Sequence, residues 1–107
     1  MKLLTEAIRK AAEKQYALGS DFDQKVVAKF FDPCGEWSWY LMNIDPEENS
    51  YAWGIVKGFE VEMGSFSLDE LAAIKTKPFG LGIERDLHFT PLPAREVWER
   101  LHRGEHI

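Results

Sequence analysis

Residues 84–88 hold the densest group of chemically capable side chains in this sequence. Two carboxylates, a guanidinium and an imidazole lie there within five residues, at Glu84, Arg85, Asp86 and His88. In an extended strand alternate side chains share a face, so Glu84, Asp86 and His88 are expected on one face and Arg85 on the other. Two carboxylates and an imidazole can ligate a divalent metal or act as general acid and base. Glu84, Asp86 and His88 are therefore the candidate catalytic and metal-ligating residues.

The same residues have a structural interpretation, which we favour. Arg85 can pair with a nearby carboxylate and hold the segment against a sheet, with His88 hydrogen-bonded beneath the last helix. Structural ion-pair networks often imitate catalytic sites. A protein without catalytic activity is therefore favoured, and Arg85 becomes a candidate binding residue.

Two acids elsewhere in the sequence are further candidate binding residues. Asp45 precedes a proline at the start of a turn, where an aspartate side chain commonly hydrogen-bonds the main chain that follows. Glu62 alternates with Val61 and Met63, as expected for a half-exposed strand. Either acid could assist a metal site, but a structural role for Asp45 and a solvated position for Glu62 are favoured.

Aromatic residues and a single cysteine offer two other kinds of site. Trp37, Trp39, Tyr51 and Trp53 could stack on nucleic-acid bases, but core packing is favoured because no basic residues are interleaved with them. Cys34 has no histidine nearby in the sequence to activate it, so a nucleophilic role is not expected.

Composition restricts the partners and the compartment. Lys and Arg total 13 against 18 acids, giving a net charge of −5, which argues against a broad phosphate-binding surface and favours a protein partner. The single cysteine is typical of a reducing compartment. No signal-like segment is present, and no apolar run approaches the roughly 20 residues that span a bilayer. We therefore expect a soluble cytoplasmic protein without a membrane partner.

The hydrophobic periodicity predicts one α+β domain over residues 1–107. Helices are expected at residues 5–18 behind a Thr5 cap, at 67–75 behind a Ser67 cap, and from Pro93 to Gly104 with Trp98 on its apolar face. Strands are expected at residues 25–32, 36–44, 51–56 and 60–66, with a last extended segment at 83–90 and a loop at 77–82.

Short turns join most of these strands. They predict a mainly antiparallel sheet of about four to five strands, with the first and last helices packed on it. In the strand at 36–44, Trp37, Trp39 and Leu41 should share one face, and Tyr40, Met42 and Ile44 the other. Because both faces are apolar, this strand should be covered on both sides.

Several motifs occur together in a specific order and spacing. They are Val27-Ala28-Lys29-Phe30-Phe31, then Trp39 with Ile44-Asp45-Pro46-Glu47, then Val61-Glu62-Met63-Gly64, then Ser67-Leu68-Asp69-Glu70-Leu71, and finally Glu84-Arg85-Asp86-Leu87-His88-Phe89-Thr90-Pro91. From about residue 3 to residue 91 the chain thereby resembles the bacterial family called domain of unknown function 2958, found largely in plasmids, integrated elements and phages. It departs from that family at Asn43, where an acid is frequent, and at Val56-Lys57, where many relatives carry Cys-Asp.

The resemblance brings no established reaction but implies a small accessory protein of a mobile genetic element. We expect it to bind a macromolecular partner, protein rather than nucleic acid, without a cofactor. The alternative is a metal-dependent hydrolase or nuclease that uses Glu84, Asp86 and His88 with a divalent metal; some relatives carry a single-stranded-DNA endonuclease label. A stress or defence module whose fold matters more than any site is a third possibility.

Overall fold

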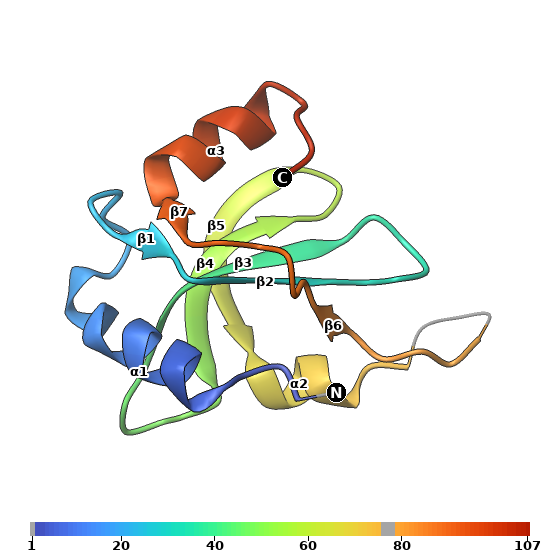
Figure 1. Cartoon of the computed structure of the whole chain (residues 1–107), viewed down its shortest axis with the longest axis horizontal. Helices are drawn as coiled ribbons and strands as arrows, with labels where there is room; N and C mark the ends of the chain where they lie inside the picture. The colour runs from blue at the N-terminus through green and yellow to red at the C-terminus, as the bar shows by residue number, and fades with distance from the viewer. Residues whose placement is uncertain (1, 76–78) are drawn as a thin grey trace.

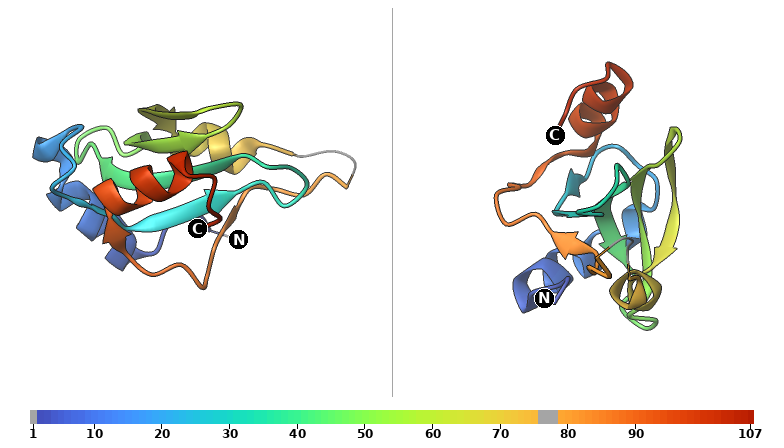
Figure 2. Two further views of the ribbon diagram at one scale, coloured as in Figure 1. Left: turned by 90° about the horizontal axis from the view of Figure 1, so that it is seen from above. Right: turned by 90° about the vertical axis from the view of Figure 1, so that its right-hand side faces the viewer.

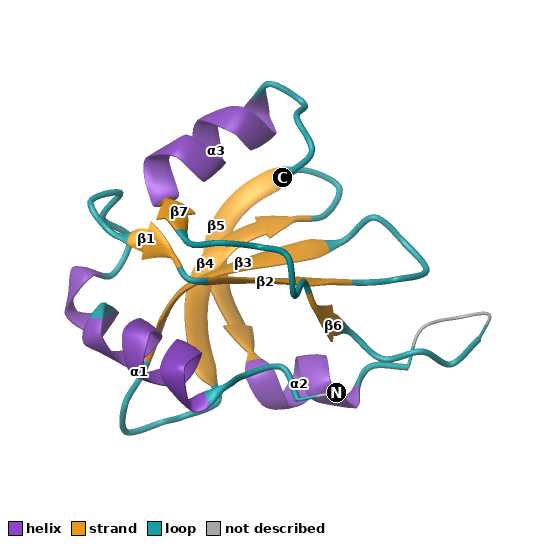
Figure 3. Cartoon of the chain, in the orientation of Figure 1, coloured by secondary structure: helices purple, strands orange, loops and turns teal. Residues whose placement is uncertain are grey.

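The computed structural model describes residues 2–75 and 79–107, and its helices and strands form a single α+β unit (Figures 1 and 3). The elements in chain order are α1 (Glu6–Lys14), the short 3-10 helix η1 (Tyr16–Leu18), β1 (Lys25–Val26), β2 (Ala28–Phe31), β3 (Ser38–Ile44), β4 (Tyr51–Lys57), β5 (Val61–Ser67), α2 (Leu68–Ala73), β6 (Glu84–Arg85), β7 (Leu92–Pro93) and α3 (Ala94–His102). The predicted fold class is confirmed, with a helix near each end and a short one between. Of the loop expected at 77–82, residues 77 and 78 lie outside the described residues.

The main sheet is antiparallel and has the strand order β5-β4-β3-β2-β6, while β1 and β7 pair separately. β3 is its central strand, and every residue of β3 is buried. A strand that is buried on both sides of its pleat needs cover on both faces of the sheet. α3 lies on one face, and α1 and α2 lie on the other (Figure 2).

Each face therefore has its own core. Beneath α1 and α2, the buried residues of the first core are Leu3, Ala12, Ala28, Phe30, Trp39, Leu41, Ile44, Ala52, Leu68, Leu71 and Ile83. Beneath α3, those of the second core are Val26, Tyr40, Met42, Ile55, Ala94, Val97 and Leu101. Trp98 was expected in the core but is only half-buried, with its ring against Phe22 and His102 at centroid distances of 5.7 and 4.3 Å.

One part of the predicted side-chain alternation is wrong. Ile44 packs in the first core with Leu41, rather than with Tyr40 and Met42. The pairing of β3 with β4 shifts register between Leu41 and Asn43, which is a β-bulge. An extra residue in one strand reverses the alternation beyond it, so Ile44 changes face.

Helix ends follow their local chemistry closely. Thr5 caps α1 by accepting a hydrogen bond from the Ile8 N–H at 3.1 Å, although the α-helix ends at Lys14, before the predicted 18. Ser67 caps α2 by accepting from the Glu70 N–H at 3.2 Å. Gly104 adopts a φ of +80° just beyond α3, a conformation that glycine reaches without strain. Over the described residues, no helix is long and apolar enough to cross a membrane.

Two predicted strands are shorter than expected. The segment at 25–32 divides into β1 and β2, because Lys25 and Val26 pair with β7 while Ala28–Phe31 pair with β3. The segment at 83–90 is a strand only at Glu84 and Arg85, which pair with Phe31 and Phe30 at the edge of the sheet. The end of β6 decides the geometry of the Glu84–His88 motif.

Candidate functional site

The Glu84–His88 motif turns sharply after its second residue. The Asp86 carboxylate Oδ1 accepts a hydrogen bond from the His88 N–H at 2.8 Å. Aspartate side chains form such turns because they reach the main chain two residues ahead. The expectation that Glu84, Asp86 and His88 share one face of an extended segment is therefore wrong.

The second oxygen of Asp86 faces a half-buried lysine. Asp86 Oδ2 lies 4.0 Å from Lys29 Nζ, and the Asp86 N–H donates to the Lys29 carbonyl at 2.9 Å. The Lys29 side chain is only 13% exposed, and its ammonium also donates to the Ile107 carbonyl. Burial lowers the pKa of Lys29, and the Asp86 charge opposes that shift. Asp86 thus joins the end of β6 to β2, and Lys29 in turn joins β2 to Ile107.

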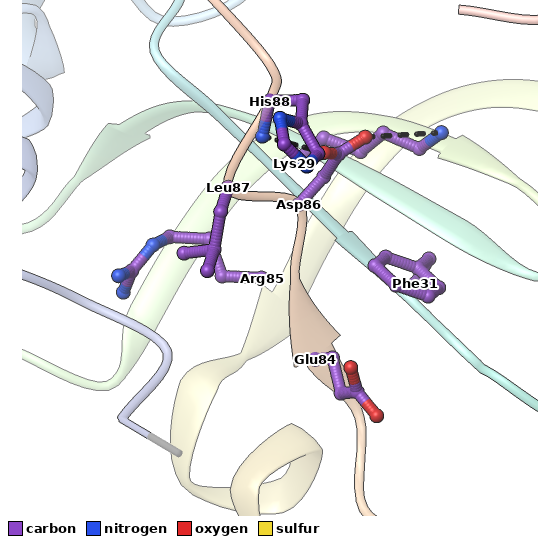
Figure 4. Close-up of a pocket in the computed structure, with 7 residues that line it drawn as sticks. All are labelled: Lys29, Phe31, Glu84, Arg85, Asp86, Leu87 and His88. Atoms are coloured by element: carbon purple, nitrogen blue, oxygen red, sulfur yellow. Dashed lines mark hydrogen bonds and ion pairs between the residues drawn. The ribbon is translucent and has the colours of Figure 1, made fainter.

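Arg85 points away from this contact and towards the N-terminal segment (Figure 4). Its Nη1 donates to the carbonyls of Lys2 and Leu3, at 2.8 and 3.1 Å. Leu3 is buried in the first core, so Arg85 fastens the N-terminal segment beside β6. Sequence reasoning anticipated a tethering role for Arg85, but with a carboxylate rather than with these carbonyls.

The motif lines an open cavity without forming a metal cluster. The cavity has a volume of about 310 Å³ and is lined by Lys29, Phe31, Glu84, Arg85, Asp86, Leu87 and His88. Figure 4 shows Glu84 pointing away from Asp86 and His88. Throughout 2–75 and 79–107, no three His, Cys, Asp or Glu side chains are placed to hold a metal together.

Asp45 forms the turn expected of it. Its Oδ1 accepts from the Glu47 and Glu48 N–H groups at 2.9 and 3.3 Å. These hydrogen bonds, that from Glu47 first, lower the pKa of the Asp45 carboxyl. The Asp45 carboxylate therefore has a structural role, which is to hold the turn that follows β3.

The fold separates Asp45 and Glu62 from each other and from the Glu84–His88 motif. Glu62 lies on β5 at one edge of the sheet, whereas Glu84 lies on β6 at the other. Glu62 pairs with Val56, which pairs with Trp39, so Glu62 lies near the beginning of β3. Asp45 follows Ile44 and lies beyond the other end of that strand. Neither acid can assist a metal site at Asp86.

An exposed aromatic pair lies beside Glu62 and was missed in the sequence. Phe59, at the tip of the β4–β5 turn, is 96% exposed, and Trp37 before β3 is 38% exposed. Their rings meet edge to face at a centroid distance of 5.5 Å, and Trp37 also contacts Trp39 at 6.1 Å. We call Trp37 and Phe59 the aromatic patch.

Two acids border the aromatic patch. Glu60 and Glu62 are exposed, and they line a shallow hollow of about 490 Å³ together with Trp37, Val56, Gly58 and Phe59. We call Glu60 and Glu62 the acidic rim. The signal available in the sequence was Gly58-Phe59-Glu60, an aromatic residue at the centre of a short turn, because turns lie at the surface. Trp37, expected in the core, is instead partly exposed in this patch.

The architecture and its motifs can be compared with known proteins. A family model described as "Protein of unknown function (DUF2958)" matches residues 2–105. The chain belongs to this family. No curated protein and no solved structure matches it. Membership covers both the Glu84–His88 motif and the aromatic patch, and it assigns a reaction to neither.

Proposed function

We propose that this family member is a macromolecule-binding accessory protein of a mobile genetic element, acting in the cytoplasm on a protein partner. The observation that carries this proposal is the exposure of Phe59, 96% of which is open to solvent beside Trp37. Placing a large aromatic side chain almost wholly in water gains nothing for folding. Burying the Phe59 ring against a partner would provide the favourable free energy of removing its apolar surface from water.

The aromatic patch has the features of an interaction anchor. Tryptophan and other aromatic residues dominate the binding free energy of many protein interfaces. Trp37 contacts the Trp39 ring and packs closely against Gly58, which hold it in place. An anchor that is already ordered loses less conformational entropy on binding.

Charge indicates the chemistry of the partner. The acidic rim of Glu60 and Glu62 and the net charge of −5 attract basic segments and repel phosphate backbones. A partner surface with lysine or arginine beside an apolar side chain fits both the rim and the patch. The association with mobile elements rests on the family resemblance, and the compartment on the single cysteine.

An array of synthetic peptides, graded from acidic to basic and with or without leucine, tests this function. We expect the wild-type protein to bind basic peptides that contain leucine. Phe59→Ala should weaken that binding about tenfold, as loss of an interface anchor does. Phe79→Ala is the matched control, because Phe79 is also exposed, at 77%, but lies outside the patch. Equal binding by Phe59→Ala, or tighter binding of single-stranded DNA than of any peptide, contradicts the proposal.

A metal-dependent hydrolase remains the second candidate function, because Glu84, Asp86 and His88 line one cavity. Titration calorimetry with Mn²⁺ on the wild type, Asp86→Asn and His88→Ala tests it. A wild-type signal that both folded variants lose supports a metal site. Absence of any wild-type signal leaves the motif with the structural contacts of Asp86 and Arg85.

A further inference from the structure

β5 is a long edge strand. Residues Val61–Ser67 all pair with β4, with no break in register, and β5 has no strand on its other side. The opposite edge is β6, a strand of two residues that ends in the Asp86 turn. Of the two edges, only β5 offers a length of main chain suited to another strand (Figure 2).

The direction of the main-chain groups in β5 follows from two hydrogen bonds. The Tyr51 carbonyl accepts from the Asp45 N–H on the β3 side of β4, so the alternate residues Ala52, Gly54 and Val56 point to β5. Their partners in register are Phe66, Gly64 and Glu62. The Glu60 carbonyl, which accepts from the Gly58 N–H, points the same way.

Val61, Met63 and Ser65 therefore point their N–H and C=O groups away from the sheet. In the part of the chain that the structure describes, none of these groups has a main-chain partner. Natural edge strands are usually blunted by charged side chains, a proline, a bulge or a covering segment. β5 has one charged residue, Glu62, but no proline, no lysine and no bulge against β4.

Acids flank both ends of this edge. Glu60 and Glu62 lie at the start, and Glu48 and Glu70 line a hollow of about 370 Å³ at the far end with Ser65 and Ser67. If a second copy of the chain paired antiparallel through the same edge, Glu60 and Glu62 of one copy would approach Glu48 and Glu70 of the other. Like charges that face each other across strands are unfavourable, so the charges select a basic strand over a second copy.

We propose that β5 accepts an extended basic segment of a partner protein as a further antiparallel strand. The inference rests on the proposed function, and it specifies how the partner binds. The segment exchanges main-chain hydrogen bonds with Val61, Met63 and Ser65, which is the mode called β-augmentation. Its basic side chains lie opposite Glu60 and Glu62, and its next residue reaches Phe59, because β5 runs directly on from the aromatic patch.

A short synthetic peptide, Val-Thr-Val-Thr-Lys-Thr-Arg-Leu, serves as the probe. Run antiparallel to β5, it places its lysine opposite Glu62, its arginine opposite Glu60 and its leucine opposite Phe59. Its three threonines then lie opposite Val61, Met63 and Ser65, where the hydrogen bonds form. Methylation of the threonine amide nitrogens should weaken binding about tenfold or more, while methylation of the lysine and arginine amides should not.

The matching change in the protein is Ser65→Pro, with Ser65→Ala as its control. Ser65 is exposed, and its N–H lies outside the β4–β5 hydrogen bonds, so proline should preserve the fold and block the edge. Calorimetry should show about tenfold weaker peptide binding to Ser65→Pro and unchanged binding to Ser65→Ala. Circular dichroism checks that both variants are folded. Binding of the methylated peptides to the wild-type protein tests the same main-chain hydrogen bonds without changing the protein.

The outcomes separate this inference from the proposed function. If Phe59→Ala weakens peptide binding but Ser65→Pro and threonine methylation do not, the patch binds proteins and strand addition is wrong. Absence of peptide binding up to about 1 mM, which corresponds to a binding free energy weaker than about −4 kcal/mol, overturns strand addition. A wild-type dimer in sedimentation that Ser65→Pro dissociates also overturns it, since a second copy would then occupy the edge.

Discussion

The indole ring of Trp37 lies directly against the main chain of Gly58. A methyl group at position 58 would overlap the Trp37 ring atoms Cη2, Cζ3 and Cζ2. The hydrogen side chain of Gly58 is therefore what allows the tip of the β4–β5 turn to hold Trp37 next to Phe59. The geometry of the aromatic patch depends on this contact between two turns far apart in the sequence.

Gly58→Ala should displace Trp37 without disturbing the core. Position 58 does not require a positive φ, so alanine fits the main chain and only the ring must move. We expect a shifted tryptophan emission spectrum and weaker binding of basic peptides, with a similar urea midpoint. Gly64→Ala is the control, because a Cβ there meets nothing within 4 Å. Identical spectra for Gly58→Ala and the wild type would show that the ring is not held by this contact.

Ser67→Ala should destabilise the protein by about 0.5–2 kcal/mol, the usual cost of losing a helix N-cap. The Ser67 hydroxyl accepts from the Glu70 N–H and lies 2.9 Å from the Ser50 hydroxyl, so both contacts disappear. Urea denaturation measures the effect, with Ser65→Ala as an exposed control on the same strand. Equal midpoints for the two variants would reject the capping role.

Arg85→Ala should release the N-terminal segment at a cost of about 1–2 kcal/mol, because two charge-assisted hydrogen bonds to Lys2 and Leu3 are lost. Hydrogen exchange at Leu3 and urea denaturation report the local and global effects. Arg9→Ala is the control, since its bond to the Asn49 carbonyl is longer, at 3.4 Å, and exposed. Unchanged exchange at Leu3 would contradict the tether.

The pH dependence of stability should differ between the wild type and Lys29→Met. Burial lowers the pKa of Lys29 in the folded protein below its ordinary value of 10.5, only partly offset by Asp86. Between these two pKa values the unfolded chain binds more protons, so the wild type gains stability as pH rises through that window. Lys29→Met lacks this gain.

Urea midpoints of both proteins, taken at increasing alkaline pH, measure this difference. Burial also raises the pKa of Tyr40, and Lys29 Nζ lies 5.7 Å from the centroid of the Tyr40 ring. The double variant Lys29→Met/Tyr40→Phe, compared with Tyr40→Phe alone, therefore isolates the contribution of Lys29. A stability difference that stays constant with pH would show that Lys29 titrates normally.

Local chemistry made much of this protein predictable from its sequence. Thr5 and Ser67 cap their helices, Asp45 forms its turn, and the doubly apolar strand at 36–44 is the central one. Each of these features depends on residues a few positions apart, so a local sequence pattern is enough to predict it. The family resemblance also rests on short motifs of consecutive residues.

The candidate site depended on tertiary structure. Asp86 could have continued a strand, but its side chain instead turns the main chain at His88 and meets Lys29 from β2. Ile44 changed face because β3 took an extra residue against β4. In both cases the deciding partner comes from another strand, which local periodicity cannot identify.

Exposure of the aromatic patch and the open edge at β5 were likewise decided by the tertiary structure. The sequence pattern favoured a core position for Trp37 and gave no sign that Phe59 is almost fully exposed, and it predicted β5 as an ordinary half-exposed strand. The strand order places β5 at the edge, and the contact between Gly58 and Trp37 sets the patch beside it. Apolar side chains are buried only where another element covers them. Local patterns in the sequence therefore predicted most of the helices and strands, whereas the packing of these elements decided where the strands divide and which surfaces were left for a partner.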